Sequence, residues 1–187
     1  MSGHPTAPFR RVVAAVGLGQ LLAWGSSYYL LATLARPMAA ELGVSGVWVY
    51  ASFSAALIVA ALLGPWAGAR MDRHGGRRVL LASNLLFAAS LAVLALAQDR
   101  YMLTLGWLAM GVAMPMGLYD AAFSTVVGLY GAQARRAIVG VTLIAGFASS
   151  VSISSCIIST SMLSFVSRIL VILSVVAAIF WSRTSER

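Results

Sequence analysis

Residues 68–80 read GARMDRHGGRRVL and separate two long apolar stretches of the chain. Five charged side chains gather here, in a sequence that is 60% hydrophobic and only 10% charged: Arg70, Asp72, Arg73, Arg77 and Arg78. Soluble globular domains carry about 25% charged residues. The sequence is therefore that of an integral membrane protein whose charge is concentrated in the connections between apolar segments.

The apolar stretches are near the length of 20 residues that an α-helix needs to cross about 30 Å of hydrocarbon. They predict an all-α, polytopic transmembrane helical bundle with five or six spans, at residues 12–35, 47–69, 79–98, 101–131, 137–158 and 163–182. The first stretch is too long for the core of a signal peptide. Membrane helices tolerate Gly and Pro, so neither Gly64-Pro65 nor Met114-Pro115 is expected to break its span.

Arginine decides the expected orientation, because the chain contains no lysine and has a net charge of +8. If the N-terminal tail, residues 1–11, lies in the cytoplasm, only three arginines fall in outer loops: Arg36, Arg100 and Arg168. The inner segments then hold the other ten: Arg10, Arg11, Arg70, Arg73, Arg77, Arg78, Arg135, Arg136, Arg183 and Arg187. Cytoplasmic loops are enriched in Lys and Arg. We therefore expect a multi-pass protein of the inner, or plasma, membrane with a cytoplasmic N-terminus.

The loop carries a spaced pattern: Gly68-x-x-x-Asp72-Arg73-x-Gly75-Gly76-Arg77-Arg78. It resembles the signature loop of the major facilitator superfamily, which joins the second and third transmembrane helices, as it would here. GQLLAWGSSYYL, residues 19–30, resembles the family's cavity-lining first helix. GLYDAAF, residues 117–123, and GAQARRAIVGVTLIAGFAS, residues 131–149, are similar to its fourth helix, inner loop and fifth helix. The resemblance covers roughly residues 12–150 and implies the N-terminal six-helix half of the facilitator fold.

The resemblance implies a secondary transporter that carries a small solute by alternating access, often driven by a proton gradient, between two six-helix halves. The loop is implied to latch the halves together in one state. Gly68, with Gly64 one turn earlier, would let another helix approach closely, and Asp72 would accept hydrogen bonds from a helix N-terminus. The arginines would bridge neighbouring inner ends or touch anionic lipid. The alternative is a tight basic loop that only sets orientation.

The end of the chain departs from the family's pattern. All 17 glycines lie at or before Gly146, whereas six isoleucines occur from Ile153 onward. We hypothesise that the reading frame was disrupted near residue 152, which leaves residues 12–152 as five facilitator-like helices and residues 153–187 as a divergent hydrophobic tail. Residues 163–182 could still form a sixth span, and a natural polar sixth helix is the alternative. A half-length chain would be an inactive remnant, a half-transporter that needs a second copy or a separate second half, or a non-transporting scaffold.

Polar and aromatic side chains inside the predicted spans are candidates for a substrate or proton path: Gln20, Trp24, Tyr28, Asn84, Tyr119 and Asp120. Ionisable residues within spans are functional candidates by default. Asp120 would thus be a proton acceptor or, alternatively, a solvated or arginine-paired carboxylate near the cytoplasmic interface. Gln20, Trp24 and Tyr28 would line a path, or supply interhelical hydrogen bonds and an interfacial aromatic belt. Asn84 could instead link helices, and Trp107 is expected to be an interface anchor.

No catalytic, cofactor or metal site is predicted, and we expect no enzyme. The sequence has no carboxylate cluster and no phosphate-binding Gly-Lys-Ser/Thr pattern, and His4 and His74 lie outside the spans. Nucleic-acid binding would need arginines on one solvated face among stacking aromatics. The expected partners are the lipid bilayer, an unidentified small-molecule solute and, for a half-length chain, a second copy or a second half.

Overall fold

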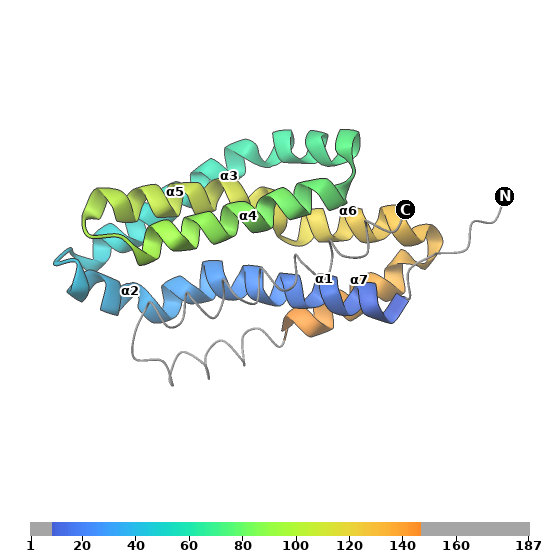
Figure 1. Cartoon of the computed structure of the whole chain (residues 1–187), viewed down its shortest axis with the longest axis horizontal. Helices are drawn as coiled ribbons and strands as arrows, with labels where there is room; N and C mark the ends of the chain where they lie inside the picture. The colour runs from blue at the N-terminus through green and yellow to red at the C-terminus, as the bar shows by residue number, and fades with distance from the viewer. Residues whose placement is uncertain (1–8, 147–187) are drawn as a thin grey trace.

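The computed structural model describes residues 9–146, and this range consists of helices joined by short connections, with no strand. Its elements are α1 (Phe9–Trp24), the π-turn η1 (Gly25–Tyr29), α2 (Leu30–Glu41), α3 (Gly46–His74), α4 (Gly76–Ala95), α5 (Arg100–Gly117), α6 (Tyr119–Tyr130), the 3₁₀ turn η2 (Gly131–Gln133) and α7 (Ala134–Gly146). The helices run mainly along the long axis of the molecule (Figure 1). Most of the expected N-terminal tail and the whole of residues 153–187, with the expected span 163–182, lie outside the described residues.

Three helical stretches in the described range are long and apolar enough to cross a membrane: Gly46–His74, Arg78–Ala95 and Arg100–Gly146. Their mean hydropathies are 2.0, 1.9 and 1.4. The protein is therefore a helical membrane protein. The path from Phe9 to Glu41 is helical too, but the π-turn divides it into helices of 16 and 12 residues, each shorter than a membrane span.

The helix ends follow from short-range chemistry. The Ser45 hydroxyl accepts a hydrogen bond from the backbone N–H of Trp48 at the start of α3, and the Asp99 carboxylate accepts one from Met102 N–H at 2.7 Å at the start of α5. Such caps satisfy donors that the first helical turn leaves free. At the other end of α3, Gly75 has φ 78° and ends α3 while starting α4, so the chain reverses within a single residue.

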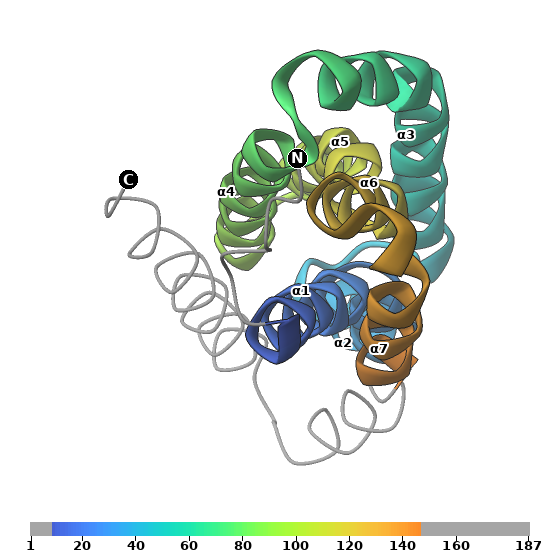
Figure 2. The same cartoon turned by 90° about the vertical axis from the view of Figure 1, so that its right-hand side faces the viewer.

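The connections alternate between two ends of the bundle (Figure 1). We call one the arginine end: it gathers the start of α1, the α3–α4 turn and the α6–α7 turn, and the rings of Phe9 and Tyr130 lie 5.2 Å apart there. The opposite end holds the α2–α3 and α4–α5 connections. There the Trp48 indole N–H donates to the Thr104 hydroxyl, 3.2 Å away, and joins α3 to α5. Figure 2 views the bundle from the arginine end, with α1 beside α7.

The apolar core is divided. A large cluster toward the opposite end joins the end of α1, α2, α3, α4 and α5 around the fully buried Trp107, Phe87 and Met110. Trp107 is 0% exposed, so its expected role as an interface anchor is wrong: its ring packs edge-on against Phe53, with centroids 5.1 Å apart. The sequence could not show this, because an anchoring and a buried tryptophan look alike within an apolar span.

Two smaller clusters lie toward the arginine end. One joins α1, α6 and α7 through Val13, Val16, Ala122, Val126, Ala134, Ala137 and Val141. The other joins α3, α4 and α6 through Ala67, Met71, Val79, Leu80 and Ala121. The first consists of valine and alanine alone, and the second adds Met71 and Leu80 to them.

Glycine sets the closest helix contacts. A Cβ at Gly111 of α5 would collide with the backbone carbonyl of Ala56 in α3, so these two helices meet backbone to backbone. Gly17 of α1 faces the Ile144 side chain of α7, where an added Cβ would lie 2.9 Å from it. Small residues allow such approach in membrane bundles, where dispersion contacts hold helices together.

The predicted span 101–131 is not one helix. Leu118 has ψ −164°, which ends α5 at Gly117 and starts α6 at Tyr119. The expectation that Pro115 would be tolerated holds within α5, but the helix breaks three residues later. The expected spans 12–35 and 47–69 lie within helical residues, the span 79–98 ends early at Ala95, and the span 137–158 is described only as far as Gly146.

Candidate functional site

The break at Leu118 frees a backbone carbonyl in the middle of the bundle. In a continuous helix the carbonyl of Gly117 would accept from Ala121 N–H, but that N–H donates to the carbonyl of Leu118 at 3.1 Å instead. The side chain of Gln20 replaces it: Nε2 donates to the Gly117 carbonyl at 2.7 Å, from 97 residues away in sequence. Gln20 is 1% exposed. A buried amide of α1 therefore supports the interruption between α5 and α6.

The first helix is interrupted at nearly the same level. The π-turn begins five residues after Gln20, at Gly25, and its serines are fully buried. Their hydroxyls both donate to the carbonyl of Ala23, Ser27 at 2.6 Å and Ser26 at 3.3 Å. Single π-turns within α-helices occur frequently at functional sites. Two irregular backbone segments thus lie close together, one in α1–α2 and one in α5–α6.

Aromatic side chains join these two segments. Trp24 stacks on Tyr28 with ring centroids 4.9 Å apart, and its other neighbour is Tyr119 of α6 at 5.2 Å. Tyr28 also meets Phe53 of α3 edge-on at 5.5 Å. The indole N–H of Trp24 is buried and has no hydrogen-bond acceptor among the described residues. The structure therefore brings together Gln20, Trp24, Tyr28 and Tyr119, four of the six predicted path residues.

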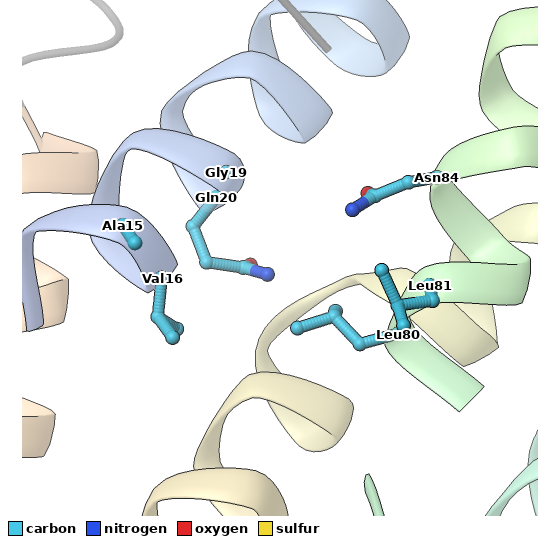
Figure 3. Close-up of a pocket in the computed structure, with 7 residues that line it drawn as sticks. All are labelled: Ala15, Val16, Gly19, Gln20, Leu80, Leu81 and Asn84. Atoms are coloured by element: carbon cyan, nitrogen blue, oxygen red, sulfur yellow. The ribbon is translucent and has the colours of Figure 1, made fainter. Parts of the chain in front are cut away.

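A small pocket lies between α1 and α4. It is lined by Ala15, Val16, Gly19, Gln20, Leu80, Leu81 and Asn84, and so has no charged residue in its lining. The side chains of Gln20 and Asn84 point toward one another across it (Figure 3). Gln20 Oε1 has no hydrogen-bond partner among the described residues. Asn84, the fifth predicted path residue, thus faces the same Gln20 that supports the helix break.

Asp120 lies apart from this pocket. It is exposed in the first turn of α6, where a negative charge interacts favourably with the positive end of the helix dipole. No ion pair joins its carboxylate to any arginine whose side chain the structure describes, and the arginine-paired interpretation stays a prediction. Its neighbour Tyr119 contacts Trp24. Asp120 therefore follows a residue of the aromatic cluster in sequence, but its own side chain lies on the exposed side of α6.

The predicted signature loop forms the turn between α3 and α4. Gly75 needs its positive φ to make the one-residue reversal. Gly76 packs the turn against α6, because an added Cβ there would collide with the Thr125 hydroxyl and lie 2.9 Å from that of Ser124. Gly75 and Gly76 of the pattern thus have structural reasons, and the turn touches the helix that carries Asp120.

Two expectations for this loop are not met by the described residues. Gly68 and Gly64 have no atom within 4 Å of an added Cβ, so no helix among residues 9–146 approaches them. Asp72 is exposed in the last turn of α3, and its carboxylate accepts no hydrogen bond from a helix N-terminus in this range. An acid at a helix C-terminus is disfavoured by the helix dipole. Asp72 therefore does not stabilise its own helix.

Arginine is distributed as unevenly in space as in sequence. The arginine end holds Arg10, Arg11, Arg70, Arg73, Arg77, Arg78, Arg135 and Arg136, whereas Arg36 and Arg100 belong to the half with the opposite connections. Arg73 and Arg78 of the loop are exposed. The guanidinium of Arg70 lies 4.9 Å from the ring centroid of Trp66, a cation–π contact.

Sequence reasoning missed two residues of the site. Ser83 of α4 is fully buried and donates to the carbonyl of Ala113 in α5 at 3.1 Å. Gly117 faces it, and an added Cβ there would collide with the Ser83 hydroxyl and lie 2.7 Å from Phe87. Pro115 and Gly117 precede the break, but both residue types also occur within continuous membrane helices, so the sequence held no specific signal for it.

Among residues 9–146 no three His, Cys, Asp or Glu side chains are grouped so that they could hold a metal ion. The chain matches no protein-family model, and no significant match is found among curated proteins.

Proposed function

We propose that this protein is a secondary transporter of the major facilitator type, represented by the N-terminal half of that fold. One observation carries the proposal: the buried Gln20 amide of α1 holds the freed carbonyl of Gly117 where α5 and α6 separate, beside the π-turn. Both interruptions lie inside long apolar segments, where a regular helix would otherwise be favoured.

Membrane helices tolerate irregular backbone only where it is buried in protein or lines a water-filled cavity. Many secondary transporters build their sites from discontinuous helices near the bilayer midplane. The two interruptions here are joined by Gln20 and by the contact of Trp24 with Tyr119, next to a pocket with an amide on each side. This arrangement supports a path for a solute rather than a purely structural bundle.

The arginine end supports a cytoplasmic placement of the start of α1 and of the signature turn. Five spans then follow, from α1–α2, α3, α4, α5–α6 and α7, and residues 12–152 form the facilitator-like helices. The membrane is a cell's inner, or plasma, membrane. Asp120, exposed on α6, is the proton acceptor of a proton-coupled cycle.

The transporter works together with a second set of helices. Asp72 lies at the helix end that disfavours an acid, and Gly64 and Gly68 leave one side of α3 open among the described residues. These features support a latch whose partner is outside residues 9–146, such as a second copy of the chain or a separate second half. A non-transporting scaffold is the second candidate, favoured by the same open side of α3.

The test uses the full chain in liposomes loaded with a pH-sensitive dye, under a solute gradient. The panel comprises glucose, inositol, alanine, citrate and a quaternary ammonium dye. We expect at least one solute to drive proton entry, and Asp120→Asn to reduce that entry at least tenfold. Ser54→Ala, an exposed serine bonded only to Tyr50 of its own helix, is the matched control and should not change it.

Crosslinking in the same liposomes separates the two candidates. Dimers together with solute-driven proton entry support a half-transporter. Dimers with no flux of any panel solute, measured directly with radiolabel, would support the non-transporting scaffold and contradict the proposed transport.

A further inference from the structure

We propose that the pocket between α1 and α4 binds an uncharged hydroxyl-bearing group, so that the solute is a neutral polyhydroxy compound such as a polyol or sugar. The identification of this ligand with the transported solute rests on the proposed transport function. The pocket itself lies between the side chains of Gln20 and Asn84, which point toward one another across it.

The Gln20 amide is oriented by its bond to the helix break. Because Nε2 donates to the Gly117 carbonyl at 2.7 Å, Oε1 is the remaining acceptor of that side chain. Gln20 is 1% exposed, and Oε1 has no partner among the described residues. A buried acceptor without a hydrogen bond is unfavourable, so a hydrogen-bond donor on a bound ligand would stabilise the site.

The opposite wall supplies a second amide. Asn84 is half-buried, points toward Gln20 and makes no hydrogen bond with another described residue. Its amide can both donate and accept. A group bound between the two must donate a hydrogen bond to Gln20 Oε1, and it can form a second hydrogen bond with the Asn84 amide. A single hydroxyl oxygen does both.

The other lining residues exclude charged groups. They are apolar and include the small Ala15 and Gly19, and no acidic or basic residue lines the pocket. An ionised carboxylate has no proton to donate to Gln20 Oε1, and an ammonium would be buried without a counter-charge. The pocket is small, so it receives one hydroxyl or hydroxymethyl group rather than a whole solute.

A second unmatched group lies one turn further along α1. The buried Trp24 indole N–H has no acceptor among the described residues, and Trp24 follows Gln20 by four positions, about 6 Å along the helix axis. Trp24 does not line the pocket, so a molecule that meets both groups must extend beyond it and carry more than one hydroxyl oxygen. This favours a polyhydroxy compound over a single alcohol.

The experiment measures binding to the purified full chain in detergent by its thermal unfolding midpoint and tryptophan fluorescence. The probes are inositol and glucose, with glucuronate and glucosamine as charged analogues of similar size. We expect saturable binding of a neutral probe and at least tenfold weaker binding of both charged ones. Asn84→Leu should weaken neutral binding about tenfold, the loss expected for one hydrogen bond. Ser54→Ala should leave it unchanged.

The outcomes separate this inference from the proposed transport. Equal binding of charged and neutral probes, unchanged binding in Asn84→Leu, or no binding of any probe, which would leave only water in the pocket, each overturn the inference. Liposome transport of a charged solute that Asn84→Leu does not alter would overturn it while sparing transport. Neutral-probe binding lost in Asn84→Leu supports it, even if the liposomes show no flux. Asn84 carries the test because Gln20 variants also lose the support of the helix break.

Discussion

The half of the bundle at the arginine end and the half at the opposite end are built differently. The opposite half packs parts of five helices around one cluster that contains the fully buried Trp107 and Phe87. The arginine half has two separate clusters, one on α1, α6 and α7 and the other on α3, α4 and α6, made mostly of valine and alanine. Apolar burial is continuous in one half and divided in the other.

The boundary between the halves is polar or irregular in every helix that crosses it. Gln20 occupies it on α1, Ser83 on α4 and Leu118 between α5 and α6, and Pro65 lies between the two clusters on α3. Polar and irregular residues thus mark the level at which the packing of apolar side chains changes from one cluster to two.

The largest expected effect concerns which end is inside the cell. In a Cys156→Ser background, Arg73→Cys and Gln98→Cys place single thiols at opposite ends of the bundle. A membrane-impermeant maleimide added to intact cells should label the cysteine at position 98 and reach position 73 only after lysis. Labelling of position 73 in intact cells would show the opposite orientation and would contradict a cytoplasmic latch.

The continuous half should be intolerant of added volume at its closest contact. Gly111→Val inserts a side chain against the backbone carbonyl of Ala56, which cannot move aside like a flexible side chain. We expect a loss of more than about 3 kcal/mol in the free energy of unfolding in mixed micelles. Gly128→Val, at an exposed position of α6 where an added Cβ meets no atom, serves as control. Equal stability of the two variants would contradict the packing of α3 on α5.

The arginine half should be sensitive at its one-residue turn. Gly75→Ala forces a Cβ into a backbone conformation with φ 78° and ψ 140°, so unfolding should become easier by about 2 kcal/mol. Gly46→Ala, at the start of the same helix α3 and without crowding, should cost less than about 0.5 kcal/mol. Chemical denaturation of both variants measures the difference, and a neutral Gly75→Ala would rule out the tight reversal.

The boundary should depend on the Gln20 amide. Gln20→Met keeps the volume but leaves the Gly117 carbonyl without its donor, so we expect a loss of about 1 to 2 kcal/mol. Ser90→Ala removes a buried hydroxyl that bonds only to the carbonyl of Leu86 one turn earlier, so it should cost less. Thermal unfolding compares them. A Gln20→Met as stable as Ser90→Ala would mean that the break does not need the amide.

The regular parts of the fold could be predicted because they depend on local pattern. Apolar length places α3 and α4, and the Gly75-Gly76 pair marks their turn. The break at Leu118 was not predicted, because Pro115 and Gly117 are compatible with a continuous membrane helix until a partner amide is available for the freed carbonyl. That amide comes from Gln20, 97 residues away.

The candidate site could be predicted in composition but not in arrangement. Five polar or aromatic residues were identified within the predicted spans, and the structure places them around the helix interruptions: Gln20, Trp24, Tyr28, Tyr119 and Asn84. Nothing in their spacing showed that Asp120 would lie on the open side of α6. The direction of a side chain depends on how the helix is rotated in the bundle, which a single sequence does not determine.

The short link between α6 and α7 constrains how the protein enters the bilayer. Only Gly131–Gln133 separates the two helices, and Arg135 and Arg136 follow at once. Since no soluble loop intervenes, the proposed orientation would have α5–α6 and α7 enter the bilayer together as a paired hairpin, with both guanidinium groups on the side of synthesis.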